Sequence, residues 1–192
     1  MVAVPRRSEM EQITIRKASL TDIPTLKALI PDSVRALQAA YYTTEQMEGA
    51  LGTVFGVDSQ LIEDGTYFIA EVESKIAGCG GWSKRKTLFG SDSSKDKEDV
   101  LLDPRHDSAR IRAFFVHPAW ARRGIGTRIM GACEAAAIEE QFWRLELVAT
   151  LTGEPFYQAH GFEGSDRFEV PLPNGASLPL VRMSKLVIQA HV

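Results

Sequence analysis

Cysteine, long apolar runs and excess basic charge are all scarce in this 192-residue sequence, and each shortage excludes a class of protein. The two cysteines, Cys79 and Cys133, are too few for a disulfide scaffold and lack the spacing of a metal site. No apolar run approaches the roughly 18 residues that a membrane span needs. The formal net charge of −3 gives no basis for nucleic acid or an anionic membrane as the main partner. We therefore predict no metal, no nucleic acid and no membrane.

Length and composition indicate one folded domain. Hydrophobic residues make up 44% and charged residues 24% of the chain, which are ordinary values for a globular protein. A chain of this length can bury a core without a metal or a disulfide. Residues 1–10 have no apolar period, so we predict a disordered N-terminus there and a folded domain over residues 11–192. No secretory signal peptide is recognised, which predicts a cytoplasmic protein with both thiols reduced and buried.

Apolar periodicity in the first half predicts short elements of both kinds. We expect a strand near 13–18, a helix over 21–30 that Pro31 and Asp32 end, and a second helical segment near 34–41. Thr43 and Gln46 form the pattern of a capping box, which predicts a further short helix. Segments 66–72 and 76–82 are predicted to pair as a hairpin. Residues 91–99 are polar and without period, which predicts a loop.

The second half predicts strands that alternate with helices and a final hairpin. We expect strands over 110–116 and 145–149, a helix after 124, a short helix over 153–160 that Thr152 caps, and a hairpin over 170–187. Asn174 and Gly175 are a strong turn signal for that hairpin. Together these elements predict an α/β (α+β) fold: a single domain with a mixed, mainly antiparallel sheet flanked by helices.

The stretch from Phe114 to Thr127 carries the most chemical information. An apolar strand runs into a basic turn with two glycines, Gly124 and Gly126, and the turn opens a helix. A helix N-terminus has unpaired N–H groups and a positive dipole end, which together bind phosphate. Glycine lets the phosphate approach the backbone, and Arg122 and Arg123 add positive potential. The endings of the P-loop and of the dinucleotide fingerprint are both absent, so neither of these nucleotide-binding motifs fits.

What remains resembles the coenzyme A loop of the GCN5-related N-acetyltransferase (GNAT) superfamily, Arg/Gln-x-x-Gly-x-Gly/Ala. Gly124 and Gly126 match, whereas Ala121 stands where the family usually has Arg or Gln, with Arg122 next to it. A second segment, residues 156–162, is similar to the family's Phe-Tyr-x-x-x-Gly-Phe. Two motifs in family order are more specific than one, so the chain is identified as a member of this superfamily with a GNAT-like domain over 11–192.

The resemblance implies an N-acetyltransferase that moves an acetyl group from acetyl-CoA, its cosubstrate, directly to an amine. The implied cofactor-binding residues are Phe114, Val116, Arg122, Arg123, Gly124, Gly126 and Thr127. In this scheme the amide of Phe114 stabilises the acetyl oxygen and that of Val116 pairs with the pantetheine arm. Tyr157 is the expected general acid for the coenzyme A thiolate, although a packed core aromatic remains the alternative.

A general base is harder to assign. Some family members carry Glu on the central strand, where this chain has Arg110 and Arg112. Glu146 on the neighbouring strand is therefore the candidate, with an ion-paired surface residue as the alternative. Glu71, Asp103 and Asp107 are weaker candidates. Where the family often has Asn, the chain reads Thr150-Leu151-Thr152, which puts one cofactor hydrogen bond in doubt.

The acceptor, the acyl chain and the assembly stay open. Aromatic and acidic residues around Tyr41, Tyr42, Met47, Trp82 and the loop after Thr87 suit a small amine better than a basic peptide. Transfer from a longer acyl-CoA remains open. The alternative function is a coenzyme A-binding sensor or interaction module of the same fold that lacks transferase activity. A homodimer is common in the family, and this sequence does not decide it.

Overall fold

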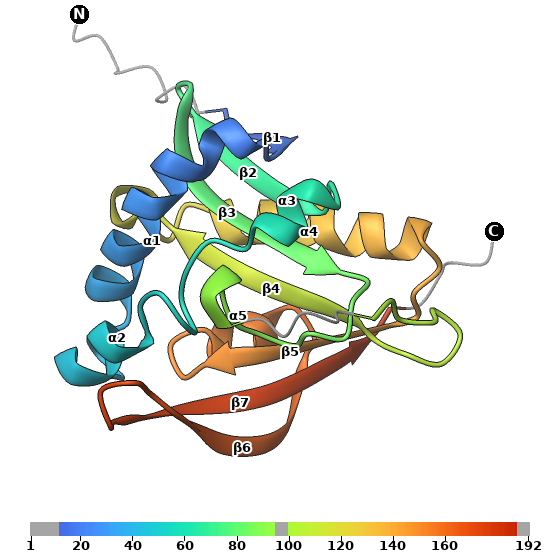
Figure 1. Cartoon of the computed structure of the whole chain (residues 1–192). Coiled ribbons are helices and arrows are strands. Elements are labelled where there is room, and N and C mark those ends of the chain that lie inside the picture. The colour runs from blue at the N-terminus through green and yellow to red at the C-terminus, as the bar shows by residue number, and fades with distance from the viewer. Residues whose placement is uncertain (1–11, 95–99, 188–192) are drawn as a thin grey trace, which may run out of the picture.

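The computed structural model describes residues 12–94 and 100–187, and over these residues seven strands form one sheet of order β1-β2-β3-β4-β5-β7-β6 (Figure 1). The strands are β1 (Thr14–Lys17), β2 (Tyr67–Val72), β3 (Lys75–Ser83), β4 (Ala109–Val116), β5 (Arg144–Thr150), β6 (Glu163–Pro171) and β7 (Ser177–Leu186). The helices are α1 (Ile23–Leu37), α2 (Thr44–Ala50), α3 (Ser59–Glu63), α4 (Ile125–Glu139) and α5 (Glu154–Ala159), with single 3-10 turns at Leu20–Asp22, Asp92–Ser94 and Pro118–Trp120. The predicted disorder of residues 1–10 and part of the predicted loop, 95–99, lie outside the described residues.

The predicted mixed, mainly antiparallel sheet flanked by helices is confirmed. Strands β4 and β5 are parallel and every other neighbouring pair in the described sheet is antiparallel. The parallel contact is short, because it holds only at Ala109 with Leu145 and at Arg110 with Glu146. Beyond these two pairs β4 and β5 diverge, as Figure 1 shows. The sheet therefore opens at its centre, and the opening is where a ligand can enter.

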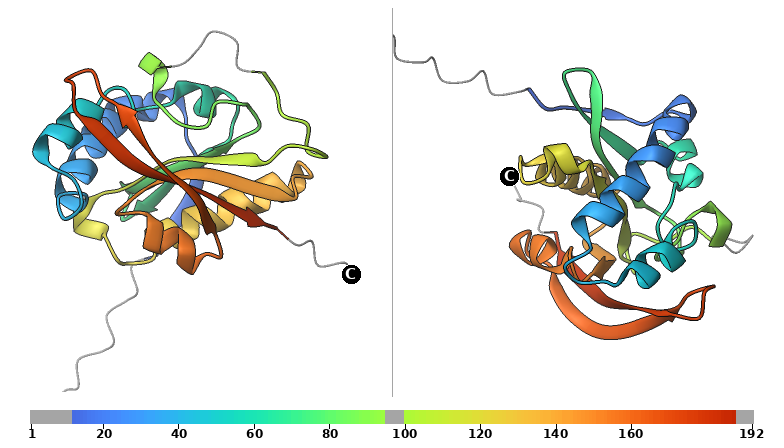
Figure 2. Two further views of the ribbon diagram at one scale, coloured as in Figure 1. Left: turned by 90° about the horizontal axis from the view of Figure 1, so that it is seen from below. Right: turned by 90° about the vertical axis from the view of Figure 1, so that its left-hand side faces the viewer.

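Two apolar cores lie on the two faces of the sheet (Figure 2). The alternation of side chains along β2 divides between them: Phe68 and Ala70 pack toward α4, whereas Tyr67 and Ile69 pack toward α1. Helix α4 contributes Ile125, Ile129, Met130, Cys133 and Ala137 to the first core, and α1 contributes Leu26, Leu29, Ile30 and Val34 to the second. Both cysteines are free and buried, as predicted.

The prediction that Pro31 ends the first helix is wrong. Helix α1 continues through Pro31 to Leu37 and includes the segment predicted as a second helix. Proline inside a helix removes one backbone hydrogen bond and costs about 3 kcal/mol. Burial of apolar side chains on both sides of Pro31, among them Ile30 and Val34, outweighs that cost because each contributes roughly 1.5–3 kcal/mol. The uninterrupted helix carries residues 33–38 to the opening in the sheet.

Most other local predictions are confirmed. Thr43 and Gln46 form a capping box at α2, where the Thr43 hydroxyl accepts from the Gln46 amide at 3.2 Å. Both hairpins form, and Gly175 in the second turn has a φ of +88°. The predicted cap of the short helix is wrong, because Gly153 occupies the N-cap of α5 and Thr152 does not cap it.

Candidate active site

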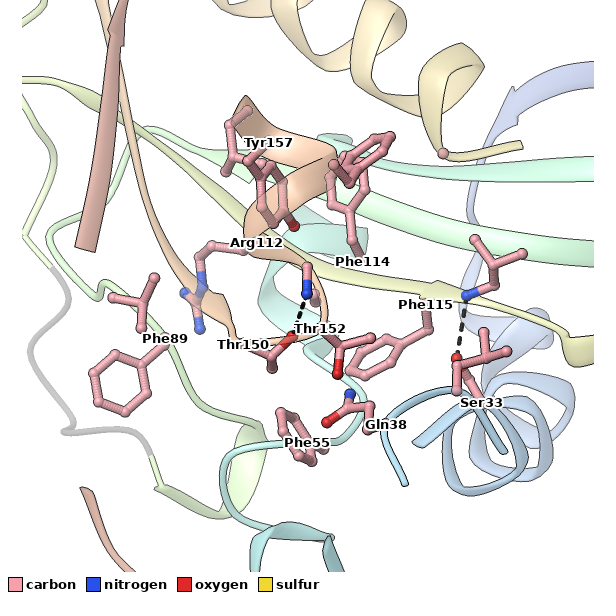
Figure 3. Close-up of a pocket in the computed structure, with 18 of the residues that line it drawn as sticks. Ser33, Gln38, Phe55, Phe89, Arg112, Phe114, Phe115, Thr150, Thr152 and Tyr157 are labelled. Carbon is pink, nitrogen blue, oxygen red and sulfur yellow. Dashed lines mark hydrogen bonds between the residues drawn. The ribbon is translucent and has the colours of Figure 1, made fainter. Parts of the chain in front are cut away.

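A cavity of about 760 Å³ occupies the opening between β4 and β5 (Figure 3). Its walls come from the end of α1, residues 54–56, residues 88–90, β4, the turn into α4, and α5. Residues from distant parts of the sequence therefore meet around one space. Its two ends differ: Figure 3 shows the start of α4 at one end, and Gln38, Phe55 and Phe89, from the end of α1 and the 54–56 and 88–90 segments, away from it.

Strand β4 bulges where it borders the cavity. Cys79 pairs with Phe115 and Gly81 with Arg112, so that Ala113 and Phe114 together face the single residue Gly80. Ala113 has a φ of +56°, a left-handed conformation that costs an alanine roughly 1–2 kcal/mol. A β-bulge leaves backbone groups out of the ladder and redirects the strand. The bulge therefore turns the backbone at Phe114 away from regular pairing beside the cavity.

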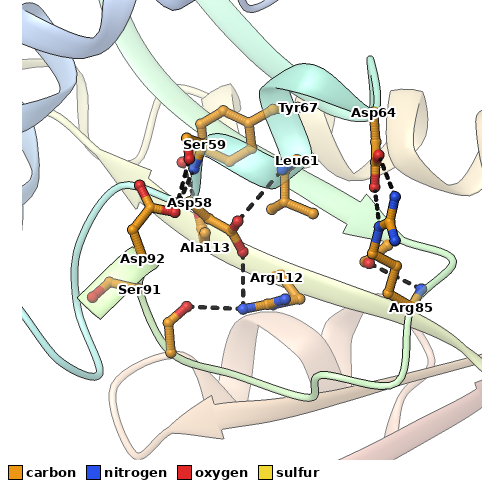
Figure 4. A network of polar contacts seen from close by, with 12 residues as sticks. Asp58, Ser59, Leu61, Asp64, Tyr67, Arg85, Ser91, Asp92, Arg112 and Ala113 are labelled. Atoms are coloured by element: carbon orange, nitrogen blue, oxygen red, sulfur yellow. Dashed lines mark hydrogen bonds and ion pairs between the residues drawn. The ribbon is translucent and has the colours of Figure 1, made fainter. Parts of the chain in front are cut away.

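Two neighbours of the bulge hold it in this shape. The buried hydroxyl of Tyr67 donates to the carbonyl oxygen of Ala113 at 2.9 Å (Figure 4). A Cβ on Gly80 would lie 2.6 Å from the ring of Phe114, so only glycine leaves room for that ring. Burial raises the pKa of Tyr67 well above its usual value, which keeps the hydroxyl protonated as a donor. Strain at Ala113 is thus offset by contacts from two other strands.

The turn into α4 presents its backbone to the cavity. Arg122 and Gly124 have φ values of +64° and +83°, and such left-handed steps in a turn shape its amides into an anion-binding concavity. Among the described residues the four amides from Gly124 to Thr127 have no hydrogen-bond partner, and the first helical bond runs from Arg128 to Gly124. A Cβ at Gly124 would meet nothing within 4 Å. These open amides at a helix N-terminus fit a pyrophosphate.

The predicted loop residues divide between the cavity and the surface. Arg122, Gly124, Gly126 and Thr127 line the cavity. The guanidinium of Arg123 instead lies 5.5 Å from the centre of the Trp120 ring, and Arg123 is not among the lining residues. Its charge contributes to the potential of the turn without forming the cavity wall.

The amide of Val116 has a hydrogen-bond partner within the chain. It donates to the hydroxyl of Ser33 at 3.3 Å, and Ser33 is buried at the cavity wall. The predicted pairing of this amide with a pantetheine arm therefore has to displace or share the long bond to Ser33. Sequence reasoning missed Ser33 because it assumed that the helix ended at Pro31.

Tyr157 extends from α5 into the cavity. Its ring packs edge-on against Phe114, Phe156 and Phe162, with centroid distances of 6.2, 5.2 and 5.9 Å. Figure 3 shows its hydroxyl directed toward the middle of the cavity, and no hydrogen bond to it occurs within the described part of the chain. Burial raises the pKa of Tyr157 above its ordinary value of 10, so the phenol is protonated at neutral pH.

Glu146 lies beside the cavity and not in its wall. Its carboxylate forms an ion pair with Arg110 and a second one, at 3.5 Å, with Arg182. It does not line the cavity. Each of its two oxygens is engaged by a guanidinium group, which leaves neither one placed to contact an amine in the cavity. The weaker candidates are also engaged elsewhere: Glu71 pairs with Arg16, Asp103 pairs with Arg105, and Asp107 accepts from the Asp103 amide.

The end of the cavity away from the α4 turn is built from side chains. Gln38 is 8% exposed, it lines the cavity, and its Oε1 has no partner within the described residues. The Oγ1 of Thr152 is likewise buried without a partner there. Arg112 is buried, bonds the Gly90 carbonyl at 2.8 Å and pairs with the buried Asp58 at 2.9 Å (Figure 4).

Most residues predicted to face the acceptor lie elsewhere. Tyr42, Met47 and Trp82 are buried in the cores, and Tyr42 bonds the Pro179 carbonyl at 2.7 Å. Among the expected segments only the loop after Thr87 reaches the cavity, through residues 88–90. Tyr42 and Trp82 pack in the cores, and sequence alone does not distinguish a core aromatic side chain from one that contacts a ligand. Gln38, Phe55 and Arg112 line the cavity instead, and no local motif marks them.

The described residues contain neither a metal-binding cluster nor a membrane-spanning helix. No group of three or more His, Cys, Asp and Glu side chains in residues 12–94 and 100–187 is arranged to hold a metal ion. In the same residues none of the helices combines the length and apolarity needed to cross a membrane.

Comparisons with known proteins place these features in a family. The model of the acetyltransferase (GNAT) domain family matches residues 63–164, just over half of the chain. The match includes the β4 bulge, the glycine turn and the Phe156–Phe162 segment. A comparison with curated proteins found no match.

Solved structures share the fold at low identity. A GCN5-related N-acetyltransferase from Rhodopseudomonas palustris is 21% identical, with a TM-score of 0.69 and coverage of 94% of this chain and 99% of that chain. PaiA N-acetyltransferase from Thermoplasma acidophilum, solved with coenzyme A, is 16% identical, with a TM-score of 0.63 and coverage of 92% and 99%. Salmonella typhimurium yncA, a putative acetyltransferase solved with acetyl-CoA, is 12% identical, with a TM-score of 0.58 and coverage of 94% and 96%. The family match, the fold and the open amides at the α4 turn lead to one conclusion: this chain belongs to the GNAT family of acetyl-CoA-dependent acetyltransferases.

Proposed function

We propose that this protein transfers the acetyl group of acetyl-CoA directly to the nitrogen of a small amine. The observation that carries the proposal is the combination of four unpartnered amides at the start of α4 with Tyr157 across the same cavity. The amides hold the pyrophosphate, and Gly124 and Gly126 let it approach. Acetyl-CoA supplies an activated acetyl group as a thioester, and the chain positions it.

Two groups of the chain act on the reacting atoms. The Phe114 amide, in the β4 bulge, donates to the acetyl oxygen as negative charge develops there. The Tyr157 phenol gives its proton to the departing thiolate, which its raised pKa permits because the group is protonated at neutral pH. The Val116 amide receives the pantetheine arm once its bond to Ser33 yields.

We do not assign a base role to Glu146, the carboxylate expected from the sequence. Its ion pairs with Arg110 and Arg182 and its position outside the cavity wall argue for a structural role at the point where β4 and β5 meet. None of the described residues that line the cavity is Asp or Glu. The attacking amine therefore loses its proton to water in the cavity, or it loses it in solution through its own acid–base equilibrium.

The test is release of free thiol from acetyl-CoA in the presence of a panel of small amines, together with coenzyme A affinity by calorimetry. We expect micromolar-range binding and amine-dependent thiol release, of the kind typical for enzymes. Binding of coenzyme A without turnover for any amine would instead support the alternative, a sensor or interaction module. No binding at all would remove the proposal.

Domain extent and location are part of the proposal. One continuous sheet from β1 to β7 supports a single acetyltransferase domain over residues 11–192. The two buried free thiols suit a reducing cytoplasm.

Limited proteolysis tests the domain boundary, and we expect cleavage to be confined to the first ten residues. Size-exclusion chromatography with light scattering decides between a monomer and a homodimer.

A further inference from the structure

The acceptor end of the cavity offers no counter-ion for a cation. Among the described residues the arginines that line the cavity are Arg112, at this end, and Arg122, at the α4 turn, and no described carboxylate lines it. Acids that adjoin the cavity wall already have partners: Asp58 pairs with Arg112, Glu146 with Arg110, and Glu154 with Arg167. An ammonium ion that entered would lose its water and gain no negative partner, which is strongly unfavourable.

Gln38 places a neutral amide where binding of a cation would require a carboxylate. It caps the C-terminal end of α1, is 92% buried, and has an Oε1 atom without a partner among the described residues. A buried carbonyl oxygen without a donor is costly, so the site is complete only when a ligand donates to it. Figure 3 shows Gln38 and Phe55 on the side of the cavity opposite Tyr157.

The surrounding wall is apolar and aromatic. Phe55 packs edge-on against Phe115 at 6.2 Å, and Phe89 contacts Phe168 at 6.3 Å, so both cavity-lining rings are held in place by neighbours. Leu180 lies on the same wall. Such a surface binds an apolar or aromatic substituent by burial of area.

We infer that the acceptor is a small aralkyl amine that binds as the neutral free base, with one N–H donated to Gln38 Oε1. This inference rests on the proposed acetyl transfer. The proton balance agrees with it: as the C–N bond forms and the C–S bond breaks, the nitrogen loses one proton and the sulfur gains one from Tyr157. Water returns the released proton to Tyr157, so a neutral amine needs no carboxylate base.

The first experiment measures charge selectivity by binding alone. Benzamide and benzamidine have nearly the same shape, but benzamidine is a cation at neutral pH. Calorimetry on the coenzyme A-loaded protein should give benzamide an affinity about tenfold or more above that of benzamidine, because only the cation is left unpaired. Equal affinities, or preference for benzamidine, would overturn the inference even if acetyl transfer is intact.

The second experiment measures which protonation state reacts. With benzylamine, kcat/KM should rise about tenfold per pH unit between pH 7 and 8.5, because the neutral fraction grows at that rate below the amine pKa. A profile that is flat across this range contradicts selection of the free base. Absence of acetylation for every amine overturns the proposed function, whereas the benzamide comparison still tests this inference.

Variants of Gln38 separate its role from packing. Gln38→Met keeps the length but removes the acceptor oxygen, and we expect a several-fold loss of benzamide affinity with coenzyme A affinity unchanged. Gln38→Glu adds a carboxylate and should reverse the preference toward benzamidine. Gln60→Met, in α3 and outside the cavity wall, is the matched control. Unaltered selectivity in folded Gln38→Glu protein would exclude Gln38 from recognition.

Discussion

The two ends of the cavity are built by different means. At the coenzyme A end, open backbone amides from one continuous segment, 124–127, line the cavity. At the acceptor end, side chains from Gln38, Phe55, Phe89 and Arg112 meet although they are far apart in sequence. The backbone end depends on main-chain shape and tolerates many side chains, whereas the acceptor end depends on the identity of each side chain. Substitutions can therefore test the two ends separately.

The two ends also differ in electrostatics. Four open amides and Arg122 make the coenzyme A end suitable for an anion. At the acceptor end the Arg112 charge is compensated by Asp58, and two open groups among the described residues, Gln38 Oε1 and Thr152 Oγ1, are neutral. This contrast is what the proposed pairing of a highly charged cosubstrate with an uncharged amine requires.

The largest effect should follow from breaking the buried ion pair at the acceptor end. Asp58→Asn leaves the cap of α3 in place but removes the negative partner of Arg112, whose side chain is 2% exposed. Loss of this negative partner beside a buried guanidinium should cost about 3 kcal/mol in the free energy of unfolding, measured by urea denaturation. A loss below about 1 kcal/mol would show that water reaches Arg112.

The second largest effect should be a loss of coenzyme A affinity, confined to the coenzyme A end of the cavity. In Gly126→Val the new Cβ lies 3.1 Å from the Phe156 ring, and the added methyl groups need room in the part of the cavity wall that Gly126 forms. We expect coenzyme A affinity to fall on the order of 100-fold, equivalent to losing one or two charge-assisted hydrogen bonds. Calorimetry measures it.

A matched control lies in the same helix. At Gly131 an added Cβ would meet nothing within 4 Å, so Gly131→Ala should bind coenzyme A normally and gain about 0.5–1 kcal/mol of stability. If both variants lose affinity equally, the backbone description of this end is wrong.

Tyr157→Phe lies between the two ends and should affect turnover without affecting binding. Loss of the general acid should lower kcat about tenfold or more, with coenzyme A affinity unchanged because the ring packing remains. Steady-state kinetics give kcat, and calorimetry gives the affinity. Tyr41→Phe, at an exposed position outside the cavity, is the control. Wild-type turnover in Tyr157→Phe would leave this residue a packing role only.

The smallest effect should come from loosening the bulge. Tyr67→Phe removes the donor to the Ala113 carbonyl, and we expect about 1–2 kcal/mol loss of stability and a several-fold fall in kcat with little change in KM. Ala113→Gly relieves the positive φ and should recover about 1 kcal/mol in the double variant without restoring kcat. Parallel recovery of stability and turnover would show that Tyr67 acts on folding and not on the position of Phe114.

Local patterns predicted the fold class and most elements because local physics governs them. The capping box at Thr43, the Asn174-Gly175 turn and the glycine turn into α4 each follow from neighbouring residues. The rule that failed was also local: Pro31 was expected to end the helix, but tertiary burial of Ile30 and Val34 carried α1 on to Leu37. That error misplaced Ser33, whereas Gln38 was missed because no local motif marks it.

The sequence by itself determined the coenzyme A end, since a strand, two glycines and a helix start are enough to set main-chain amides toward a phosphate. Only the tertiary structure decided the acceptor end, because it depends on how α1, the 54–56 and 88–90 segments and β4 pack around the divergence of β4 and β5. Tertiary contacts also placed Glu146 in an ion pair and left Gln38 Oε1 without a hydrogen-bond donor among the described residues. The physical reason is distance along the chain. A backbone binding site is formed by adjacent residues, whereas a side-chain pocket is formed by residues that only folding brings together.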